Sequence, residues 1–415
     1  MRFAGNASEP EPSRGVTAGT SIALREGELM HVDLMGRAVL FHREAAGRRT
    51  FEHRLQTWLE AADVRLNGSR PWDPRIIRPR ALWRCARGTL EAGRAYADGD
   101  WECPALDELA ARLVRARQPY DVFPRWRRLL RCAGRWRNPQ RPRKSRGAVR
   151  HYEGRSDLFQ SMLGSTMAYS CGYWANAATL DEAQAAKHDL VCRKLGIEPG
   201  MRVLDVGCGW GAFAEHAARH YGAIVTGVTL ADEQAALAHE RTAGLRVSIV
   251  ASDYRRVEGR FDRVVSIGMF EHVGPRNYRT FFRKLAGWLV PDGLALLHSI
   301  GGLRSTTSTD PWLDTFIFPG SVIPSEAQIA RASEGLFVLE DWHNFGAYYD
   351  KTLCAWHENV SRAWSTELSA YPETFRRTWR YYLLTCAGLF RARVAQLWQL
   401  VLSPRGVPGG YRRVC

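Results

Sequence analysis

One stretch of this chain, VLDVGCGWGAF at residues 203–213, constrains the fold more than any other. Apolar residues lead into Asp205, and Gly207, Gly209 and Gly211 follow at every second position. Glycine allows a backbone to turn sharply and to approach a ligand closely. Because helix-forming residues come next, we expect a buried strand, a tight turn and a helix N-terminus, whose unpaired N–H groups suit a nucleotide-like ligand.

Apolar runs and helical patterns alternate along the chain after this turn. Such alternation is typical of an α/β domain with a parallel sheet and helices on both faces. With the strand before the turn, this pattern predicts a seven-stranded sheet, and two of its strands are expected at one edge. Strands are predicted at 224–228, 245–250, 261–267, 294–299, 337–342 and 397–402, and helices at 231–243 and 277–289.

Composition divides the chain into four parts. Residues 1–47 have little apolar periodicity and are rich in Gly, Ser, Glu and Pro, which predicts a disordered leader. Residues 48–118 carry helical patterns, among them 81–97 and 106–117, and are expected to form a small, mostly helical domain. Residues 119–149 contain four prolines and many arginines, which indicates a linker. The α/β pattern then occupies residues 150–415.

Most of the net charge of +15 is concentrated in one block. Residues 112–150 contain fourteen Lys or Arg and a single acid, Asp121, together with Trp126 and Trp136. Basic charge with interleaved aromatic residues is typical of contact with anionic lipid or nucleic acid. A solvated arginine-rich linker is the simpler interpretation of the same block, and contact with a membrane surface or with nucleic acid stays open beside it.

The cysteines and the hydropathy pattern indicate the compartment. Nine cysteines are scattered without a C-x-x-C pair, which argues against a metal site and against a disulfide scaffold. No apolar run approaches the roughly 20 residues needed to span a bilayer. The first 25 residues lack the apolar core of a signal peptide. We therefore expect a cytoplasmic protein that can still contact a membrane surface.

The spacing of the glycines indicates which cofactor the turn binds. A dinucleotide-binding turn reads G-x-G-x-x-G, whereas here the third glycine, Gly211, follows Gly209 after one residue. This tighter pattern resembles the first motif of S-adenosylmethionine-dependent methyltransferases. That cofactor has no phosphate, so Asp205, Gly207, Gly209 and Gly211 are expected to hold its amino-acid and ribose parts.

Residues after the next two strands are expected to complete the cofactor site. The second strand ends in GVTL, with Thr229, and lacks the acid that many such enzymes use for the ribose. Gln234, one helical turn into the next helix, is the expected substitute. Asp253 and Tyr254 follow the third strand and are expected at the adenine edge, although Asp253 also fits a simple turn residue.

With these residues placed, the chain closely resembles the cyclopropane-fatty-acyl-phospholipid synthases over roughly residues 50–415. The resemblance implies a class I methyltransferase with a Rossmann-like sheet and a smaller helical N-terminal domain. The motifs that carry it are PWD at 71–73, YADGDWEC at 96–103, YSCGYW at 169–174, GMFEHVG at 268–274, LHSIG at 297–301, FIFPG at 316–320, WHNFG at 342–346, YD at 349–350 and CAGLFR at 386–391.

The resemblance implies methyl transfer from S-adenosylmethionine to a cis double bond of a phospholipid acyl chain, closing a cyclopropane ring. An alkene is a weak nucleophile, so positioning and exclusion of water must supply most of the catalysis. The carbocation formed by the attack is stabilised by aromatic faces, for which Tyr173, Trp174, Phe270 and Tyr349 are candidates. A base must then remove a proton from the new methyl group.

The resemblance also implies that a bound bicarbonate ion is this base. The residues that match its binding set are Cys171, Glu271, His298, Ile300 and Tyr349, with Cys171 and Ile300 contributing backbone N–H groups. Three of these residue types suit a purely structural role as well. Glu271 also fits a carboxylate at a helix start, His298 a hydrogen-bonded histidine at a strand end, and Tyr349 a core aromatic residue.

Three further site residues come from the same resemblance. Tyr169 and Ser170 are implied to contact the cofactor. Cys386 matches a cysteine that the family names as an active-site residue. Because the sulfonium donates its methyl directly to the alkene, no protein nucleophile is needed, and Cys386 fits a buried packing thiol better.

Three departures from the family pattern affect details. Arg155 and Ser156 replace Gly-Asn in a loop expected to close over the cofactor site. Arg94 stands where the family commonly has Glu, and Asp100 where it commonly has Trp, in the domain that is implied to contact lipid or a second subunit. The expected partners are membrane phospholipid with unsaturated acyl chains and a second copy of the chain, at the inner face of the cell membrane.

Three competing hypotheses remain from the sequence. A fatty-acyl C-methyltransferase that yields a branched, methylene or furan-type product would use the same fold and cofactor. A nucleic-acid-binding protein would use the basic linker, although no nucleic acid partner is expected. A paralogue that binds cofactor without turnover is motivated by Arg155 and Ser156.

Overall fold

A computed structural model of the chain describes residues 28–32, 38–42, 55–116 and 154–414. The chain separates into two compact units, Met1–Trp58 and Leu59–Cys415, which are described here one at a time. In the first unit, β1 (Glu28–Val32) and β2 (Ala38–His42) pair as an antiparallel hairpin. This hairpin lies within residues 1–47, for which the sequence predicts no regular element. The predicted basic linker lies outside the described residues.

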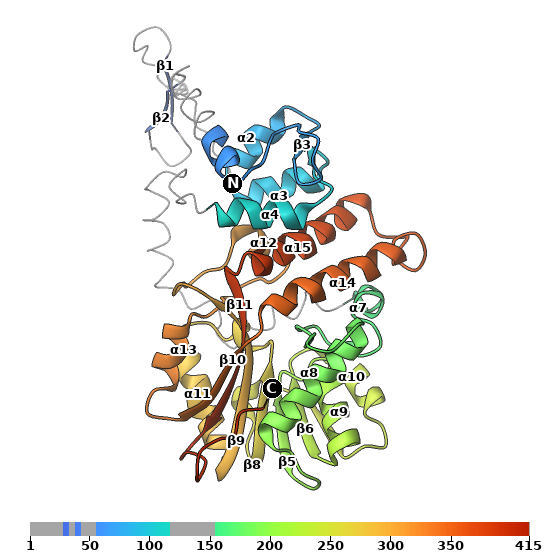
Figure 1. Ribbon diagram of the computed structural model, residues 1–415, viewed down its shortest axis with the longest axis vertical. Coiled ribbons are helices and arrows are strands. Elements are labelled where there is room, and N and C mark those ends of the chain that lie inside the picture. Colours follow the sequence, from blue (N-terminus) through green and yellow to red (C-terminus); the bar gives the residue numbers. More distant parts are fainter. Residues whose placement is uncertain (1–27, 33–37, 43–54, 117–153, 415) are drawn as a thin grey trace, which may run out of the picture. The chain divides into compact units, whose positions relative to one another are not determined.

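The second unit contains the predicted seven-stranded sheet (Figure 1). Its strand order is β10-β11-β9-β8-β5-β6-β7, and all neighbouring pairs from β9 to β7 are parallel. Only β11 runs antiparallel to its neighbours in this sheet. The α/β prediction, with two late strands at one edge, is confirmed. The strands are β5 (Arg202–Val206), β6 (Ile224–Thr229), β7 (Val247–Ala251), β8 (Phe261–Ile267), β9 (Leu289–Gly302), β10 (Val338–Asn344) and β11 (Ala395–Ser403).

Both faces of the sheet are buried under helices. Successive residues of a strand point to opposite faces, so each strand packs against helices on both sides. On β5, Val203 packs in one apolar cluster with helices α8 and α9, whereas Leu204 packs in another with α11 and α13. This two-sided burial explains why the strands read as continuous apolar runs rather than as alternating patterns. The helices beside the sheet are α8 (Leu180–Leu195), α9 (Ala212–Tyr221), α10 (Asp232–Arg241), α11 (Tyr278–Trp288) and α13 (Glu326–Ser333).

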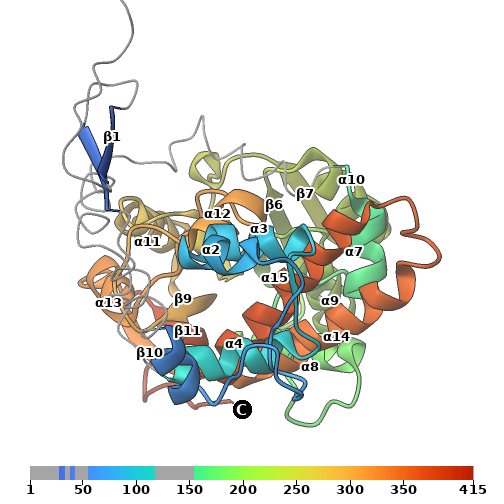
Figure 2. The ribbon, with the colours of Figure 1, turned by 90° about the horizontal axis from the view of Figure 1, so that it is seen from above.

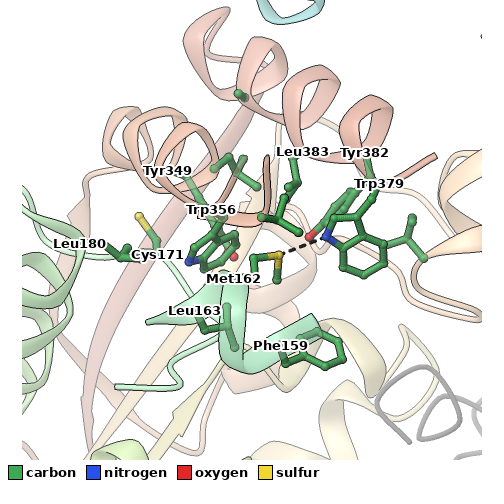
Figure 3. Packing of buried hydrophobic residues seen from close by; sticks show 14 of the residues in the cluster. Phe159, Met162, Leu163, Cys171, Leu180, Tyr349, Trp356, Trp379, Tyr382 and Leu383 are labelled. Atoms are coloured by element: carbon green, nitrogen blue, oxygen red, sulfur yellow. Dashed lines mark hydrogen bonds between the residues drawn. The ribbon is translucent and has the colours of Figure 1, made fainter. Parts of the chain in front are cut away.

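Three further helices enclose an aromatic core beyond the sheet, namely α7 (Ser156–Leu163), α14 (Ala347–Ala363) and α15 (Glu373–Arg391). Figure 3 shows Trp379 of α15 directed at Met162 of α7, where the indole N–H donates to the methionine sulfur at 3.1 Å. Trp356 of α14 is fully buried in the same cluster. This core also contains Cys171 and Tyr349, so it reaches the predicted catalytic residues.

The described residues of the helical segment pack onto α15 (Figure 2). Gly388 of α15 permits this approach, because a Cβ there would lie 2.4 Å from the carbonyl oxygen of Asp107 in α4. The predicted helix at 81–97 is divided in two by Gly88, whose φ of +116° is incompatible with a continuous helix. The elements here are β3 (Arg75–Ile76), α2 (Arg80–Ala86), α3 (Thr89–Ala97), β4 (Trp101–Glu102) and α4 (Leu106–Arg115), with α12 (Pro311–Phe316) against α3.

Asp100, one of the departures from the family pattern, is a fully buried carboxylate surrounded by arginines. Arg78 donates to its Oδ1 at 3.1 Å, Arg80 to Oδ1 at 2.9 Å and Arg84 to Oδ2 at 2.8 Å. Burial alone would raise the pKa of Asp100, but the hydrogen bonds from the three arginines outweigh it and lower the pKa. An ionic cluster therefore ties α2 to the loop before β4.

We predict that Asp100→Asn destabilises the protein by about 1–3 kcal/mol, because a buried amide cannot accept hydrogen bonds from all three arginines as the carboxylate does. Asp98→Asn is the matched control: Asp98 also pairs with Arg84, at 2.6 Å, but its side chain is 46% exposed. Exposed pairs contribute about 0–1 kcal/mol. Urea unfolding of both variants measures the difference, and equal losses would contradict a stabilising role of the buried cluster.

Candidate active site

The glycine turn joins β5 to α9 as predicted. Gly207, Gly209 and Gly211 have φ values of +86°, +54° and +83°, in the left-handed region that favours glycine. The Gly207 N–H donates to the Val228 carbonyl at 2.8 Å, which ties the turn to β6. A Cβ at Gly207 would lie 2.7 Å from the Met269 side chain, so glycine is also needed for this close approach. The turn therefore stands between two neighbouring strand ends.

A cavity of about 220 Å³ opens beside the turn, at the carboxyl ends of β5, β6 and β8. This is where open α/β sheets bind their ligands. Most of the predicted cofactor residues line it, whereas Gly211 and Asp253 do not. The predicted residues on its wall are Tyr169, Ser170, Asp205, Gly207, Gly209, Thr229, Gln234 and Tyr254.

The polar groups on this wall fit the cofactor that the glycine spacing indicates. The Thr229 hydroxyl donates to Gln234 Oε1 at 2.9 Å, which fixes the amide at the cavity wall. Asp205 is buried, and its Oδ2 has no hydrogen-bond partner among the described residues. A buried acceptor without a partner is costly unless a ligand supplies a donor. The Tyr169 hydroxyl lies 2.8 Å from the Tyr382 hydroxyl.

The structure places Asp253 in a turn, the simpler of its two interpretations. Its carboxylate accepts from the Arg255 backbone N–H at 3.0 Å and from the Arg255 guanidinium Nε at 2.8 Å. It thereby caps the short 3-10 helix η2 (Tyr254–Arg256). Tyr254 and Arg255 face the cavity instead.

Two buried polar side chains, Glu271 and His298, lie beside the cavity. Glu271 follows the end of β8, and His298 lies near the end of β9. Glu271 is buried in the 3-10 helix η3 (Phe270–His272), where its Oε1 accepts from the Ile300 N–H at 2.6 Å. His298 of β9 is 1% exposed, and Gln399 Nε2 lies 3.3 Å from its Nδ1. Glu271 Oε2 and His298 Nε2 are both buried without a hydrogen-bond partner in the described part of the chain. Buried polar atoms of this kind indicate a bound polar ligand.

Burial determines the ionisation of both groups. It raises the pKa of Glu271 to about 7, and the hydrogen bond from Ile300 offsets only part of that rise. Burial also lowers the pKa of His298 well below its usual value, and the charges of Lys187 and Lys194 lower it further. At neutral pH the imidazole is therefore neutral, whereas Glu271 is close to its midpoint.

Cys171 and Tyr349 lie in the aromatic core (Figure 3). Phe345 of the same core lies with its ring 5.8 Å from the His298 ring. The Cys171 thiol donates to the Gly172 carbonyl at 3.2 Å, and burial raises its pKa, so it stays a neutral thiol. The Tyr349 ring lies 4.5 Å from the Phe390 ring. Burial raises the pKa of Tyr349, and the charge of the Glu271 carboxylate raises it further, which places these two groups within electrostatic range.

The other residues proposed for the site, three aromatic residues and Cys386, lie in two different hydrophobic clusters. Tyr173 and Trp174 pack against the cluster that holds Tyr349, but Phe270 packs on the other side of the sheet, 4.4 Å from Tyr278. Cys386 of α15 packs against the aromatic core, and burial raises its pKa to about 12. This environment agrees with a packing thiol rather than a nucleophile.

Several cavity residues escaped the sequence analysis. The only signal for Lys187 was its place on the buried face of α8, three and four residues before Leu190 and Val191. His272 follows Glu271 directly, and its Nδ1 is buried without a partner among the described residues. Lining residues that were not predicted are Met167, Lys187, His188, Trp210, Phe213, Arg255, Met269 and His272.

We predict that Glu271→Gln changes stability in a pH-dependent way. The folded-state pKa of Glu271 is raised from 4.5 to about 7, so the parent protein is favoured below pH 4.5 and loses that stability as the pH rises to about 7. The variant has no charge to bury. Its free energy of unfolding relative to the parent should therefore increase by up to about 3 kcal/mol between pH 4.5 and pH 8.

Chemical denaturation at both pH values in bicarbonate-free buffer measures this increase. Glu326→Gln, an exposed glutamate in the first turn of α13, is the control. A pH-independent difference between the Glu271→Gln variant and the parent would show that the carboxyl group is not strongly perturbed.

Comparison with known proteins completes the description of the site. Residues 140–400 match the family model described as mycolic acid cyclopropane synthetase. The cyclopropane-fatty-acyl-phospholipid synthase of Escherichia coli K12 is 46% identical over 357 residues, covering 85% of this chain and 93% of that protein. The tuberculostearic acid methyltransferase UfaA1 of Mycobacterium tuberculosis is 32% identical over 393 residues, covering 87% of this chain and 90% of that protein.

Solved structures agree with the sequence matches. The cyclopropane synthase MmaA2 from Mycobacterium tuberculosis superposes with a TM-score of 0.58 at 32% identity, covering 62% of this chain and 97% of that chain. The mycolic acid cyclopropane synthase CmaA1, solved with SAH and CTAB, superposes with the same TM-score of 0.58 at 31% identity, covering 62% and 97%.

Proposed function

The chain belongs to the cyclopropane synthase family of S-adenosylmethionine-dependent methyltransferases, and from this premise we propose that it methylates a cis double bond of a phospholipid acyl chain and closes a cyclopropane ring. The observation that carries the proposal is the pair of buried, unpartnered atoms Glu271 Oε2 and His298 Nε2 among the described residues. A reaction that ends with loss of a proton needs polar groups at this place in an otherwise apolar site.

The cavity residues position the cofactor in this proposal. When bound, S-adenosylmethionine supplies an activated sulfonium methyl group. The glycine turn and Asp205 hold its amino-acid and ribose parts, and Gln234, fixed by Thr229, meets the ribose. Tyr254 borders the adenine. Cofactor and lipid that fill the cavity displace water from it, which favours a weak nucleophile such as an alkene.

Glu271 and His298 are proposed to hold a bicarbonate ion, which when bound supplies the base for the departing proton. The neutral imidazole offers its Nε2, and Glu271 offers Oε2. The Ile300 N–H, which the resemblance assigned to the ion, donates to Glu271 Oε1 instead, so Ile300 positions Glu271. The Cys171 backbone N–H and the Tyr349 hydroxyl complete the proposed set. Tyr349, with its ring beside Phe390, also presents an aromatic face that stabilises a cation.

A fatty-acyl C-methyltransferase is the second candidate. Its support is the match over most of the chain to a relative named tuberculostearic acid methyltransferase. The same cofactor cavity serves both reactions. The two reactions differ in their last step. In cyclopropane formation, loss of the proton closes the ring, whereas in the alternative no ring forms and the product keeps an unsaturated or branched carbon.

We predict that purified protein transfers label from methyl-labelled cofactor to liposomes of cis-monounsaturated phospholipid, and that bicarbonate increases the rate. Glu271→Gln should lower the rate about 100-fold or more, since positioned acid–base groups contribute about that much. Glu326→Gln serves as the control. Absence of label from the lipid with and without bicarbonate would contradict the function. A full rate for Glu271→Gln would contradict only the assignment of this residue.

The substrate lies in a bilayer, so we also propose peripheral contact with the inner face of the cell membrane. None of the helices in the described residues is long and apolar enough to cross a membrane. The support is a surface around α2, on which Ile77, Leu82 and Trp83 are 47%, 36% and 49% exposed. Arg78 and Arg80 are neighbours of Ile77 and Leu82 in the sequence and are more than half exposed. Both pair with the one carboxylate of Asp100, so net positive charge remains to complement anionic lipid. On the family resemblance, the chain is further proposed to form a homodimer, which sedimentation tests.

We predict that Trp83→Ala weakens binding to anionic liposomes about tenfold, because a half-exposed indole no longer enters the interface. Salt should weaken binding of the parent protein. Leu339→Ala on edge strand β10, where Leu339 is 48% exposed, is the control for loss of surface apolar area. Binding that responds neither to Trp83→Ala nor to salt would contradict this contact surface.

A further inference from the structure

Lys187 is a fully buried lysine on α8 without an ion-pair partner in the described part of the chain. Its ammonium donates to the Ser170 hydroxyl oxygen at 2.8 Å. Lys194, two turns later on the same helix, is buried to a similar degree but pairs with Asp341 at 3.0 Å. A buried ammonium is costly unless it is paired, so Lys187 differs from Lys194 in a way that calls for an anion.

Asp205 lines the same cavity and is the complementary case, an acid without an ion-pair partner in the described part of the chain. It is 2% exposed at the end of β5, and its Oδ2 has no hydrogen-bond partner among the described residues. Burial raises its pKa to about 7, and the charge of Lys187 offsets part of this rise. The two groups interact electrostatically, yet they form no direct ion pair in the described residues. A ligand that carries both charges would satisfy both of them.

We propose that Lys187, together with the Ser170 hydroxyl that it holds, binds the carboxylate of the cofactor's amino-acid end, next to Asp205, which the proposed function already assigns to that end and which meets its ammonium group. Ser170 can take part because its oxygen accepts from Lys187, which leaves its O–H to donate. All three residues line the cavity beside the glycine turn. Lys187 thus becomes a cofactor-binding residue. This inference rests on the cofactor of the proposed function and not on its lipid substrate.

The proposal explains why two opposite charges are kept apart in a buried site. A directly paired lysine and aspartate would already satisfy each other and would offer little to a zwitterion. Ser170 holds Lys187, and the backbone of β5 holds Asp205. Because the two groups are held separately, each has a partner of opposite charge only when the amino-acid end is bound between them.

Two ligands distinguish a cofactor-binding role of Lys187 from a purely structural role of this residue. S-adenosylhomocysteine carries the amino-acid end, whereas 5′-methylthioadenosine has the same adenosine and thioether without it. Titration of the full chain should show that Lys187→Met and Lys187→Gln weaken S-adenosylhomocysteine binding about 10- to 100-fold, as expected for loss of a charged hydrogen bond. Binding of 5′-methylthioadenosine should stay within about twofold of the parent on the same grounds. Asp205→Asn should behave in the same way.

Lys194→Met is the matched control, and it should leave the ratio of the two affinities unchanged even if it lowers stability. Weakening of both ligands to the same extent by Lys187→Met, or of neither, would overturn the proposal. Failure of the parent to bind either probe would instead contradict the cofactor assignment, and failure of lipid methylation would leave this inference intact.

Discussion

The site depends on a backbone turn that only glycine can make. At Gly207 the chain leaves β5 with φ of +86°, donates its N–H to Val228 of β6 and passes within contact distance of Met269. The first contact fixes the cofactor wall. The second brings the β8 end, which carries Glu271 two residues after Met269, against the same wall. One turn therefore sets the position of both the methyl donor site and the proposed base.

The second feature that determines the site is the burial of ionisable groups in apolar surroundings. Lys187, Asp205, Glu271 and His298 are all nearly inaccessible, and burial moves the pKa of each toward its neutral form. Such groups destabilise a protein unless ligands satisfy them. Their clustering around one cavity and its neighbouring strand end is therefore better explained by binding and catalysis than by folding stability.

The sequence predicted the sheet and much of the cofactor wall, because apolar runs and the glycine spacing are local signals. It predicted less where distant segments determine the outcome. The partnership of Lys187 with Ser170 depends on how α8 packs beside the turn, and the arginines around Asp100 converge only once α2 folds back. Gly88 divides a predicted helix through its backbone conformation. Asp253 was ambiguous because one residue type suits both a turn and a ligand.

Analysis of the lipid product tests the central claim most directly. The protein is incubated with cofactor and a cis-monounsaturated phospholipid. The mass of the lipid product is then measured by mass spectrometry before and after mild hydrogenation. The account predicts a product one CH2 group heavier than the substrate that takes up no hydrogen, because the ring has replaced the double bond. A product of the same mass that takes up hydrogen would contradict ring closure and favour a methylene-branched or other unsaturated methylated product.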